Sequence, residues 1–347
     1  MTPKDSAPPT QTQPQVLCLT TGEGGTLAQA LGLAEALQRH AGAHLIERRF
    51  AIRRWARRLP AAGWHRASSV LPFWPEVALQ GGAALFAPLP GRGPVAVIGA
   101  GRHAAPLVLE LTRRLRGAGR RVASVMVLDP DLPFNLFDAV VLPQHDGLSG
   151  PNVLPVLGSL GRITAISITQ EAARQAPRFA HLPQPRLAVL IGGPAREVTW
   201  TEADSARLEQ RLGALVAAGW SLMITPSPRS DPALVKRLRH TLPEGRCWIW
   251  DGLGENPYPA ILGLAKAVLV TEDSVNMVSE AAASGRPVHA FRLSGRHPKM
   301  DRFHAAMLAQ GAVRDYDGAI GDWSYRPLAE TDRIAALLAA RHLTPAI

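Results

Sequence analysis

Short apolar runs that alternate with longer helix-like stretches are the feature that most limits how this chain can fold. The series begins with Val16–Thr20 and the helix-like Leu27–Arg39, and it restarts after a Pro-rich stretch, Gln175–Arg186. Strands that alternate with helices of about ten residues or more predict parallel sheets with right-handed crossovers. Two such series therefore predict an α/β chain of two doubly wound domains that face a cleft. The remaining runs that we interpret as buried strands are Val95–Ile98, Val122–Leu128, Ala139–Leu142, Leu187–Ile191, Ser221–Thr225, Cys247–Trp250, Ala267–Val270 and Pro287–Phe291.

The same pattern predicts four segments. Residues 1–15, rich in Pro, Thr and Gln, are expected to form a disordered tail. An N-terminal domain over residues 16–178 is expected to precede a C-terminal, ligand-binding domain over residues 179–326. Residues 327–347 are interpreted as a C-terminal helix, and the sequence leaves open whether this helix packs back on the N-terminal domain.

The composition of the chain limits the cellular compartment in which the protein is expected and the kinds of partner that it is expected to bind. The tail has no basic stretch followed by an apolar run, and nowhere does the chain reach the roughly 18 apolar residues of a transmembrane helix. The two cysteines, Cys18 and Cys247, are far apart, as in proteins of a reducing compartment. We therefore expect a cytoplasmic protein that is soluble or lies on a membrane without crossing it. Although the net charge is +10, no RNP, helix-turn-helix or zinc-finger pattern occurs, so no nucleic-acid partner is expected.

The segment of residues 270–287 is the part of the sequence that most clearly indicates a ligand-binding site. Good helix N-cap residues follow its opening strand directly: Thr271, Asp273 and Ser274. The N–H groups at such a helix start, with their partial positive charge, can hold a diphosphate. Glu280, about two turns further on, could accept hydrogen bonds from both hydroxyls of a ribose. The alternative is a capped, buried helix with Glu280 in a salt bridge.

The run Glu280-x-x-x-x-Gly285-x-Pro287, after a strand and a polar turn, resembles the donor-site signature of GT-B glycosyltransferases. Nearly the whole chain further resembles one family of glycosyltransferases, the mitochondrial fission ELM family. The matching stretches are Gly22–Gly25, Gln29–Leu37, Phe137–Asp146, Gly150–Val153, Ile191–Pro194, Trp250–Tyr258 and Val270–Pro287.

This resemblance implies a GT-B fold, with two Rossmann-like domains and a nucleotide-sugar donor, a UDP- or other NDP-sugar, bound by the C-terminal domain. It also implies that the glutamate of the signature binds the ribose. Where the family has Ser-Arg-Arg-Thr-Pro, this chain has Thr225-Pro-Ser-Pro-Arg-Ser230, so the residue that meets a phosphate or sugar there stays open. The expected donor-site residues are Gly192, Gly193, Ser227, Arg229, Trp250, Tyr258, Glu272, Asp273, Ser274, Met277 and Glu280.

Candidate bases lie in the N-terminal half, on the side that the resemblance assigns to the acceptor. They are Glu23, His103, His145 and Asp146. The mechanism we expect is direct displacement at the anomeric carbon, in which one of these groups removes the acceptor proton. The helix start near Ser274 and an arginine would stabilise the departing diphosphate. The alternative for His145 is a loop histidine beside a turn-forming aspartate.

Two further patterns, one typical of dinucleotide binding and one typical of metal binding, do not fit their positions in this sequence. Gly99–Ala104 fits GxGxxA, but Asp129, the nearest acidic strand-end residue, follows later than a dinucleotide-binding fold requires. The only DxD spelling, Asp129-Pro-Asp131, lies in the half that does not bind the donor. We therefore expect neither a cofactor nor an essential metal.

The segment Arg48–Arg66 carries seven arginines and no acidic residue. A helical wheel separates an apolar side from a basic side, which is the pattern of an interfacial helix on anionic lipid. The apolar side consists of Ile52, Trp55, Ala56 and Leu59, and the basic side consists of Arg53, Arg54, Arg57 and Arg58. A membrane-bound acceptor, such as a lipid-linked or lipopolysaccharide precursor of the cell envelope, would explain it, with the protein peripheral on the inner face of the inner membrane. The alternative is a core-facing helix with a solvated face.

Two functions compete with a glycosyltransferase. One is a non-catalytic protein that keeps the GT-B fold and recruits partners to membranes. The other is a nucleotide-sugar epimerase, which needs acid and base groups around a single sugar and no acceptor.

Overall fold

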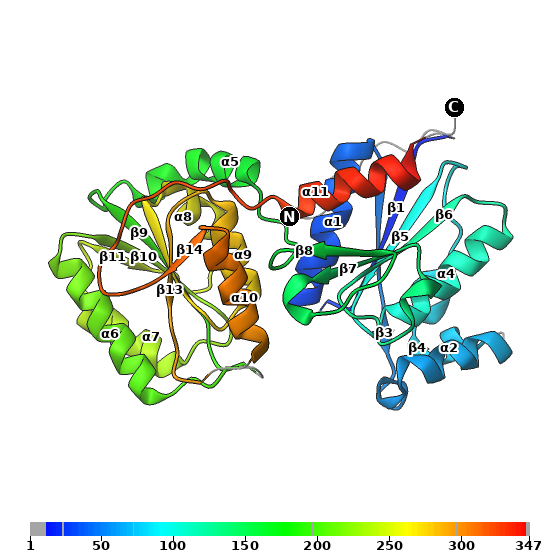
Figure 1. Ribbon diagram of the computed structural model, residues 1–347, viewed down its shortest axis with the longest axis horizontal. Helices are drawn as coiled ribbons and strands as arrows, with labels where there is room; N and C mark the ends of the chain where they lie inside the picture. The colour runs from blue at the N-terminus through cyan, green and yellow to red at the C-terminus, as the bar shows by residue number, and fades with distance from the viewer. Residues whose placement is uncertain (1–11, 23, 72, 196–197, 296–297, 345–347) are drawn as a thin grey trace. The chain divides into compact units, whose positions relative to one another are not determined.

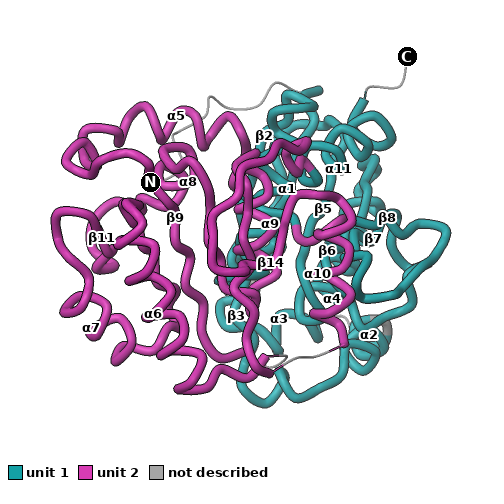
Figure 2. Tube along the Cα trace, turned by 60° about the vertical axis from the view of Figure 1, so that its left-hand side comes forward, with its two compact units in different colours: residues 1–156, 160–162, 330–347 teal, residues 157–159, 163–329 magenta. Residues whose placement is uncertain are grey.

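The computed structural model describes residues 12–22, 24–71, 73–195, 198–295 and 298–344, so residues 1–11 of the predicted tail lie outside the described residues. The chain divides into two compact units, which Figure 2 colours separately. Unit 1 comprises Met1–Val156, Leu160–Arg162 and Glu330–Ile347, and unit 2 comprises Leu157–Ser159 and Ile163–Ala329. Each unit has a parallel six-stranded sheet of its own, as the alternation of apolar runs and helices predicts.

Unit 1 is built on a sheet with the strand order β2-β1-β5-β6-β7-β8. Its strands are β1 (Gln15–Thr20), β2 (His44–Arg49), β5 (Val95–Ala100), β6 (Val122–Val127), β7 (Ala139–Pro143) and β8 (Val153–Val156). Successive side chains of a strand point to opposite faces, so β1 contributes to both halves of the core. Val16 and Cys18 pack in one cluster, and Leu17 and Leu19 pack in the other. A parallel sheet covered on both faces needs such continuously apolar strands.

Helices cover both faces of this sheet (Figure 1). The helices are α1 (Gly24–Ala41), α2 (Ala61–Val70), α3 (Trp74–Ala78), α4 (Ala105–Gly117) and α11 (Glu330–Leu338), with short turns η3 (Phe134–Leu136), η4 (Gln144–Asp146) and η6 (Ala339–Leu343). The C-terminal helix α11 packs against α1 within unit 1. Arg39 donates from Nη2 to Asp332 at 2.8 Å, and the Thr331 hydroxyl accepts from the Gly161 N–H at 3.0 Å.

The expected helix over Arg48–Arg66 is wrong. Arg48 and Arg49 end β2, and the chain then forms β3 (Ala51–Ile52), the 3-10 turn η1 (Ala56–Arg58) and α2. Strand β3 pairs antiparallel with β4 (Leu79–Gln80), which η2 (Gly82–Phe86) follows. Pro60 stands at the N-cap of α2. Proline has no N–H to donate in a helix interior, so a helix can begin after Pro60 but does not run through it.

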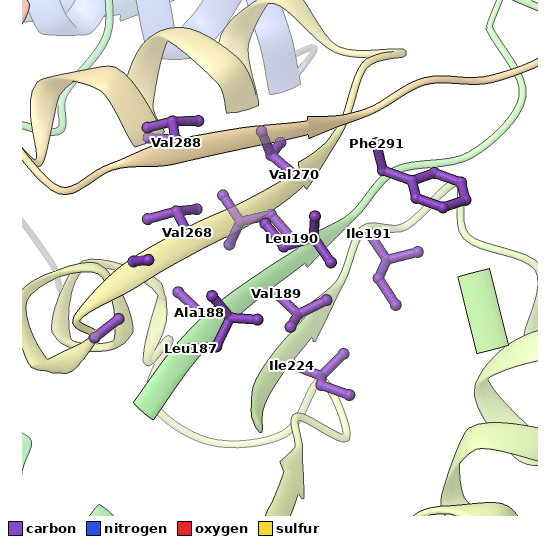
Figure 3. Packing of buried hydrophobic residues seen from close by; sticks show 14 of the residues in the cluster. Leu187, Ala188, Val189, Leu190, Ile191, Ile224, Val268, Val270, Val288 and Phe291 are labelled. Atoms are coloured by element: carbon purple, nitrogen blue, oxygen red, sulfur yellow. The ribbon is translucent and has the colours of Figure 1, made fainter. Parts of the chain in front are cut away.

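Unit 2 has the strand order β11-β10-β9-β12-β13-β14. Its strands are β9 (Arg186–Ile191), β10 (Ser221–Pro226), β11 (Cys247–Ile249), β12 (Ala267–Thr271), β13 (Val288–Phe291) and β14 (Val313–Asp315). Its helices are α5 (Ala165–Gln175), η5 (Ala176–Phe179), α6 (Glu202–Ala217), α7 (Pro232–Thr241), α8 (Tyr258–Leu264), α9 (Val275–Ala283) and α10 (Pro298–Ala309). Figure 3 shows apolar side chains of the central strands packed together, among them Leu190, Val270 and Val288.

The domain boundary differs from the one expected at residue 178, because α5 belongs to unit 2. Helix α5 packs closely on α8: a Cβ added to Gly263 would lie 2.7 Å from the Cβ of Ala172. The Pro-rich stretch after α5 packs on unit 2, since Phe179 and Leu182 are buried in the core of that unit. Within the described ranges, no helix is both long enough and apolar enough to cross a bilayer.

Candidate functional site

Three loops of unit 2 meet at one edge of its sheet. Strand β9 lies at the centre, with β10 on one side and β12 on the other, so the direction of the strand order reverses between β9 and β12. All of these pairings are parallel, so the loops that follow the three strands emerge at the same edge. Ligands of doubly wound sheets bind outside the carboxyl ends of the strands at such a reversal point. This edge is therefore the candidate site.

Asp273 ties the three loops together. Its carboxylate is buried and accepts from the backbone N–H of Gly193 at 3.0 Å and from Nη2 of Arg229 at 2.9 Å. The Thr271 hydroxyl donates to the other carboxylate oxygen at 2.7 Å, and it accepts from the N–H of Gly192 at 2.8 Å. A buried carboxylate needs such a set of donors to offset the loss of hydration. The sequence suggests that Asp273 contacts the nucleotide-sugar donor. In the structure its carboxylate instead hydrogen-bonds the neighbouring loops and holds them together.

Arg229 is held in place by the same network. Its Nη1 donates to the carbonyl oxygens of Gly193 at 3.0 Å and of Pro194 at 3.1 Å, while Nη2 forms the ion pair with Asp273. About 40% of the arginine side chain remains exposed. Ser227 stabilises the turn before it, accepting from the Arg229 N–H at 3.2 Å. The arginine thus has a fixed position and an accessible side, although its charge is largely offset by the aspartate.

The glycine pair after β9 is explained by this packing. A Cβ at Gly192 would collide with the carboxylate of Asp273, and a Cβ at Gly193 would collide with the carbonyl of Arg229. Glycine allows the close approach of two segments at such points. The pair is therefore required by the loops themselves, with or without a ligand.

Helix α9 begins beside this network. Ser274 is its N-cap, with an extended backbone, and its hydroxyl accepts from the N–H of Met277 at 3.3 Å. The N-cap position that the sequence suggests for Ser274 is the one observed. The first turn of a helix carries N–H groups without intrahelical partners and a partial positive charge, so it attracts anions.

Glu272 differs from the sequence-based expectation. Its carboxylate is buried, pairs with Nη1 of Arg292 at 2.6 Å and accepts from the N–H of Leu293 at 2.5 Å. Nε2 of His304 lies 3.7 Å away, and burial lowers the pKa of that histidine to about 4. Thr271 and Asp273 bond each other, whereas Glu272 between them makes its contacts elsewhere. We therefore remove Glu272 from the donor-binding set.

A second polar pair joins α8 and α9. Burial raises the pKa of Glu280 to about 7, against which hydrogen bonding to the Tyr258 hydroxyl acts. The pKa of Tyr258 is in turn raised well above its ordinary value, first by burial and then by the charge of Glu280. No cation of the described residues contributes to the pKa of Glu280, so the alternative of a salt bridge is not supported. Burial therefore favours the protonated form of Glu280.

The loop after β11 contains Trp250. Its indole Nε1 donates to the carbonyl of Leu253 at 3.2 Å, and its own carbonyl accepts from Arg239 at 3.3 Å. The Leu253 N–H also bonds the Asp251 carboxylate at 2.9 Å, which closes the turn. Trp250 thus has a defined place in a loop at the carboxyl end of β11, but no contact joins it to Glu280 or Asp273. Met277 packs partly against the core of unit 2.

The candidate bases of unit 1 are at the carboxyl ends of its strands. His145 is buried in η4, directly after β7, and its Nε2 lies 3.8 Å from the carboxylate of Asp146, which is too long for a hydrogen bond. His103 follows β5 and lines a small cavity together with Trp64 and Arg102. Glu23 lies outside the described residues. Within the described ranges, no group of three His, Cys, Asp or Glu side chains has a metal-binding arrangement.

Sequence reasoning missed two residues of the site, Thr271 as a hydrogen-bonding partner and Ser230. Ser230 lies within hydrogen-bond distance of the carbonyl oxygens of Ile191 and Gly192, at 2.8 and 2.6 Å. Its hydroxyl fastens the loop after β10 to the loop after β9. The position of Ser230 in a polar turn directly after a strand was the only available signal.

Comparisons with known proteins agree on one family. The family model described as mitochondrial fission ELM1 matches residues 24–342. The mitochondrial fission protein ELM1 of Arabidopsis thaliana is 30% identical over 281 residues, which cover 72% of this chain and 65% of that protein. The chain thus spans less than two thirds of the length of that relative. An uncharacterized protein of Rickettsia prowazekii is 26% identical over 285 residues, covering 71% of this chain and 79% of that protein.

A solved structure is similar over nearly all of the chain. The UDP-GlcNAc 2-epimerase of Methanocaldococcus jannaschii has a TM-score of 0.50 and 11% sequence identity, covering 95% of this chain and 100% of that one. At this identity the similarity shows the fold alone. It confirms the predicted GT-B class with two Rossmann-like domains.

Proposed function

From the premise that this chain belongs to the mitochondrial fission ELM1 family and has the GT-B fold, we propose that it is a glycosyltransferase. It binds a nucleotide sugar at the carboxyl edge of the unit 2 sheet and transfers the sugar to an acceptor. The observation that carries the proposal is the pair of Tyr258 and Glu280 on helices α8 and α9. A carboxyl group with a pKa of about 7, without a cation beside it, is unfavourable for stability and is typical of functional sites.

Glu280 is suited to a ribose. Two vicinal hydroxyls donate to one carboxylate, and charge-assisted hydrogen bonds of this kind are stronger than neutral ones. The bonds exist only with the ionised carboxylate, so nucleotide binding lowers the pKa of Glu280.

The diphosphate has a suitable site at the start of α9. The helix N-terminus supplies N–H donors and a partial positive charge, and Ser274 sets the geometry of the first turn. Arg229 can present its accessible edge to a phosphate oxygen while Asp273 holds its other edge. Trp250, at the end of β11, is the group that we assign to the base, by a backbone contact or by stacking.

Unit 1 would supply the acceptor side. We propose that a base among Glu23, His103, His145 and Asp146 removes the acceptor proton as the sugar carbon is displaced from the diphosphate. Charge on the departing diphosphate is stabilised by the helix N-terminus and by Arg229, without a metal. The acceptor that we propose is a lipid-linked or lipopolysaccharide precursor at the cytoplasmic face of the inner membrane.

A thermal-shift series with UDP, GDP and their N-acetylglucosamine and mannose derivatives tests the donor site. At least one nucleotide should raise the melting temperature of the wild type and fail to raise that of Glu280→Ala. Loss of two charge-assisted hydrogen bonds should cost about 2–4 kcal/mol of binding free energy. The matched control is Glu244→Ala, which removes an exposed glutamate of the same unit and should respond as the wild type does.

The outcomes separate the competing functions. If no nucleotide stabilises the wild type, the enzyme proposal is rejected in favour of a non-catalytic interaction protein. If a UDP-sugar binds, incubation without an acceptor distinguishes the two enzymes. A change of configuration at the sugar C2 would indicate an epimerase, whereas a transferase leaves that carbon unchanged.

A further inference from the structure

Exposed apolar side chains gather in one part of unit 1. Of the eleven large hydrophobic residues that are exposed in the described part of the chain, six lie between residues 55 and 77. They are Trp55, Leu59, Val70, Leu71, Phe73 and Val77. Val70 and Phe73 are 78% and 76% exposed. The other five are dispersed between residues 136 and 308. Scattered apolar residues need no explanation, whereas a concentration of them marks an interaction surface.

Aromatic contacts connect the elements that carry these exposed side chains. The buried Trp64 of α2 donates from Nε1 to the carbonyl of Ala56 in η1 at 3.0 Å. The Trp74 ring in α3 meets the Trp64 ring edge-to-face at 5.9 Å and the Trp55 ring at 5.6 Å. Trp55 itself is 48% exposed. Aromatic contacts therefore join η1, α2 and α3, the short elements that carry the exposed apolar side chains.

The charge of the same region is of one sign. Residues 53–75 contain five arginines, one histidine and no acidic residue. Arg54, Arg58 and Arg66 are exposed among the apolar side chains. The next acidic residue, Glu76, pairs with Arg114 at 2.8 Å and so adds little negative charge to the surface. Apolar and cationic groups are interleaved here, and a partner must match both.

We propose that this region, the surface of residues 53–71 and 73–77 on η1, α2 and α3, docks on an anionic lipid bilayer. Tryptophan and other apolar side chains enter the boundary between headgroups and acyl chains, while arginines above that boundary bind the lipid phosphates. The guanidinium group pairs with phosphate through parallel hydrogen bonds. The original expectation of one amphipathic helix is replaced by a surface of three short elements. The inference concerns unit 1 and does not depend on nucleotide-sugar binding by unit 2.

A bilayer fits better than a nucleic acid or a protein groove. Nucleic acid would leave the exposed Val70, Leu71 and Val77 without an apolar environment. A protein partner would need a matching acidic, apolar groove, whereas anionic lipid offers both features over an unlimited area. Each arginine near such a membrane is worth about fivefold in partitioning, so three together contribute on the order of a hundredfold.

Co-sedimentation of the full chain with phosphatidylcholine vesicles, with and without phosphatidylglycerol, tests the proposal. The wild type should bind only vesicles that contain phosphatidylglycerol, and high salt should release it because screening shortens the reach of charge. Two variants separate the apolar contribution to vesicle binding from the electrostatic contribution. Phe73→Ser with Val77→Ser should lose binding through its apolar part, and Arg54→Gln with Arg58→Gln and Arg66→Gln should lose about a hundredfold.

The controls remove the same kinds of group elsewhere. Leu253→Ser removes an exposed leucine of unit 2, and Arg92→Gln with Arg326→Gln and Arg341→Gln removes three exposed arginines outside the region. Both should bind vesicles as the wild type does, and all variants should melt as the wild type does. If the wild type ignores phosphatidylglycerol, or if the arginine control loses as much binding as the test variant, the proposal is overturned. Concentration-dependent self-association without lipid binding would instead assign the region to a protein contact.

Discussion

Lowering the pH from 8 to 6 should weaken nucleotide binding about tenfold, because it protonates Glu280. With a pKa of about 7, the carboxyl group is about nine tenths ionised at pH 8 and about one tenth ionised at pH 6. A ribose that donates two hydrogen bonds requires the carboxylate, so binding at pH 6 must first remove a proton. The dissociation constant therefore rises by about the factor by which the ionised fraction falls.

The same group should make folding stability depend on pH. Burial raises the pKa of Glu280 from 4.5 in the unfolded chain to about 7 in the folded chain. The folded form thus binds a proton more tightly than the unfolded form does. The resulting stabilisation is fully present below about pH 4.5 and is lost as the pH rises through 7, which corresponds to about 3 kcal/mol.

Glu280→Gln separates the two effects. Glutamine does not titrate, so the variant should lose this part of the pH dependence. Above pH 7 its free energy of unfolding should exceed that of the wild type by up to about 3 kcal/mol, while nucleotide affinity falls at pH 8. The assays are urea denaturation and calorimetry with UDP at pH 5 to 8, with Glu244→Gln, an exposed glutamate, as control.

The results can contradict each half separately. If wild type and Glu280→Gln have parallel stability curves over this range, the carboxyl does not titrate near neutral pH and the reasoning from burial fails. If stability follows the prediction but UDP affinity is independent of pH, the ribose is not bound by Glu280. A changed curve for the control would mean that other groups dominate the titration.

Three further substitutions test the loop network. Asp273→Ala should lower the free energy of unfolding by about 3–5 kcal/mol in urea denaturation, because it leaves Arg229 and the Gly193 N–H without their buried partner. Gly193→Ala should destabilise by about 1–3 kcal/mol in the same assay, since its Cβ would collide with the carbonyl of Arg229, and Gly213→Ala in α6, where a Cβ meets nothing, should stabilise by about 0.5–1 kcal/mol. Ser274→Ala should cost about 1 kcal/mol of stability through the lost N-cap, and calorimetry should show weaker UDP binding.

The central strands of both sheets and the edge strand β11 could be predicted from the sequence, whereas the edge strands β2, β8 and β14 could not. Strands such as β9 and β12 are buried on both faces, so they appear as uninterrupted apolar runs. The edge strands β2 and β14 contain His44–Arg49 and Val313–Asp315, which carry charged residues because one side of an edge strand faces water. Their apolar content is too low to stand out from a loop.

The interpretation of Arg48–Arg66 failed for a related reason. A helical wheel sorts arginines from apolar residues whether or not a helix forms, and the pairing of Ile52 with Leu79 depends on a segment 27 residues away. Pro60 was the local signal against a continuous helix. The expectation that apolar and basic side chains of this region are exposed still holds, although they lie on shorter elements than one helix.

The sequence could place the site at strand ends but could not identify its contacts. Gly193 and Asp273 are 80 residues apart, and they meet only because β9 and β12 are neighbours in the sheet. The sequence did contain a clue that Glu272 makes different contacts from Thr271 and Asp273. Successive side chains of an extended chain point to opposite sides, so Glu272 points away from its two neighbours. Raised pKa values such as that of Glu280 depend on burial, which a helix pattern alone does not reveal.

The network around Asp273 also bears on how the proposed diphosphate site could bind an anion without a surplus of cations. A carboxylate next to a diphosphate is repulsive, but this one is buried and receives hydrogen bonds from Gly193, Thr271 and Arg229. Its ion pair with Arg229 offsets most of the charge of the arginine, so the attraction for a phosphate must come mainly from the first turn of α9. A helix terminus acts over a short range and only on a group placed directly in front of it. The aspartate therefore reduces non-directional attraction and fixes the loops at the edge where we propose that the nucleotide sugar binds, so the proposed site would select its ligand by shape more than by charge.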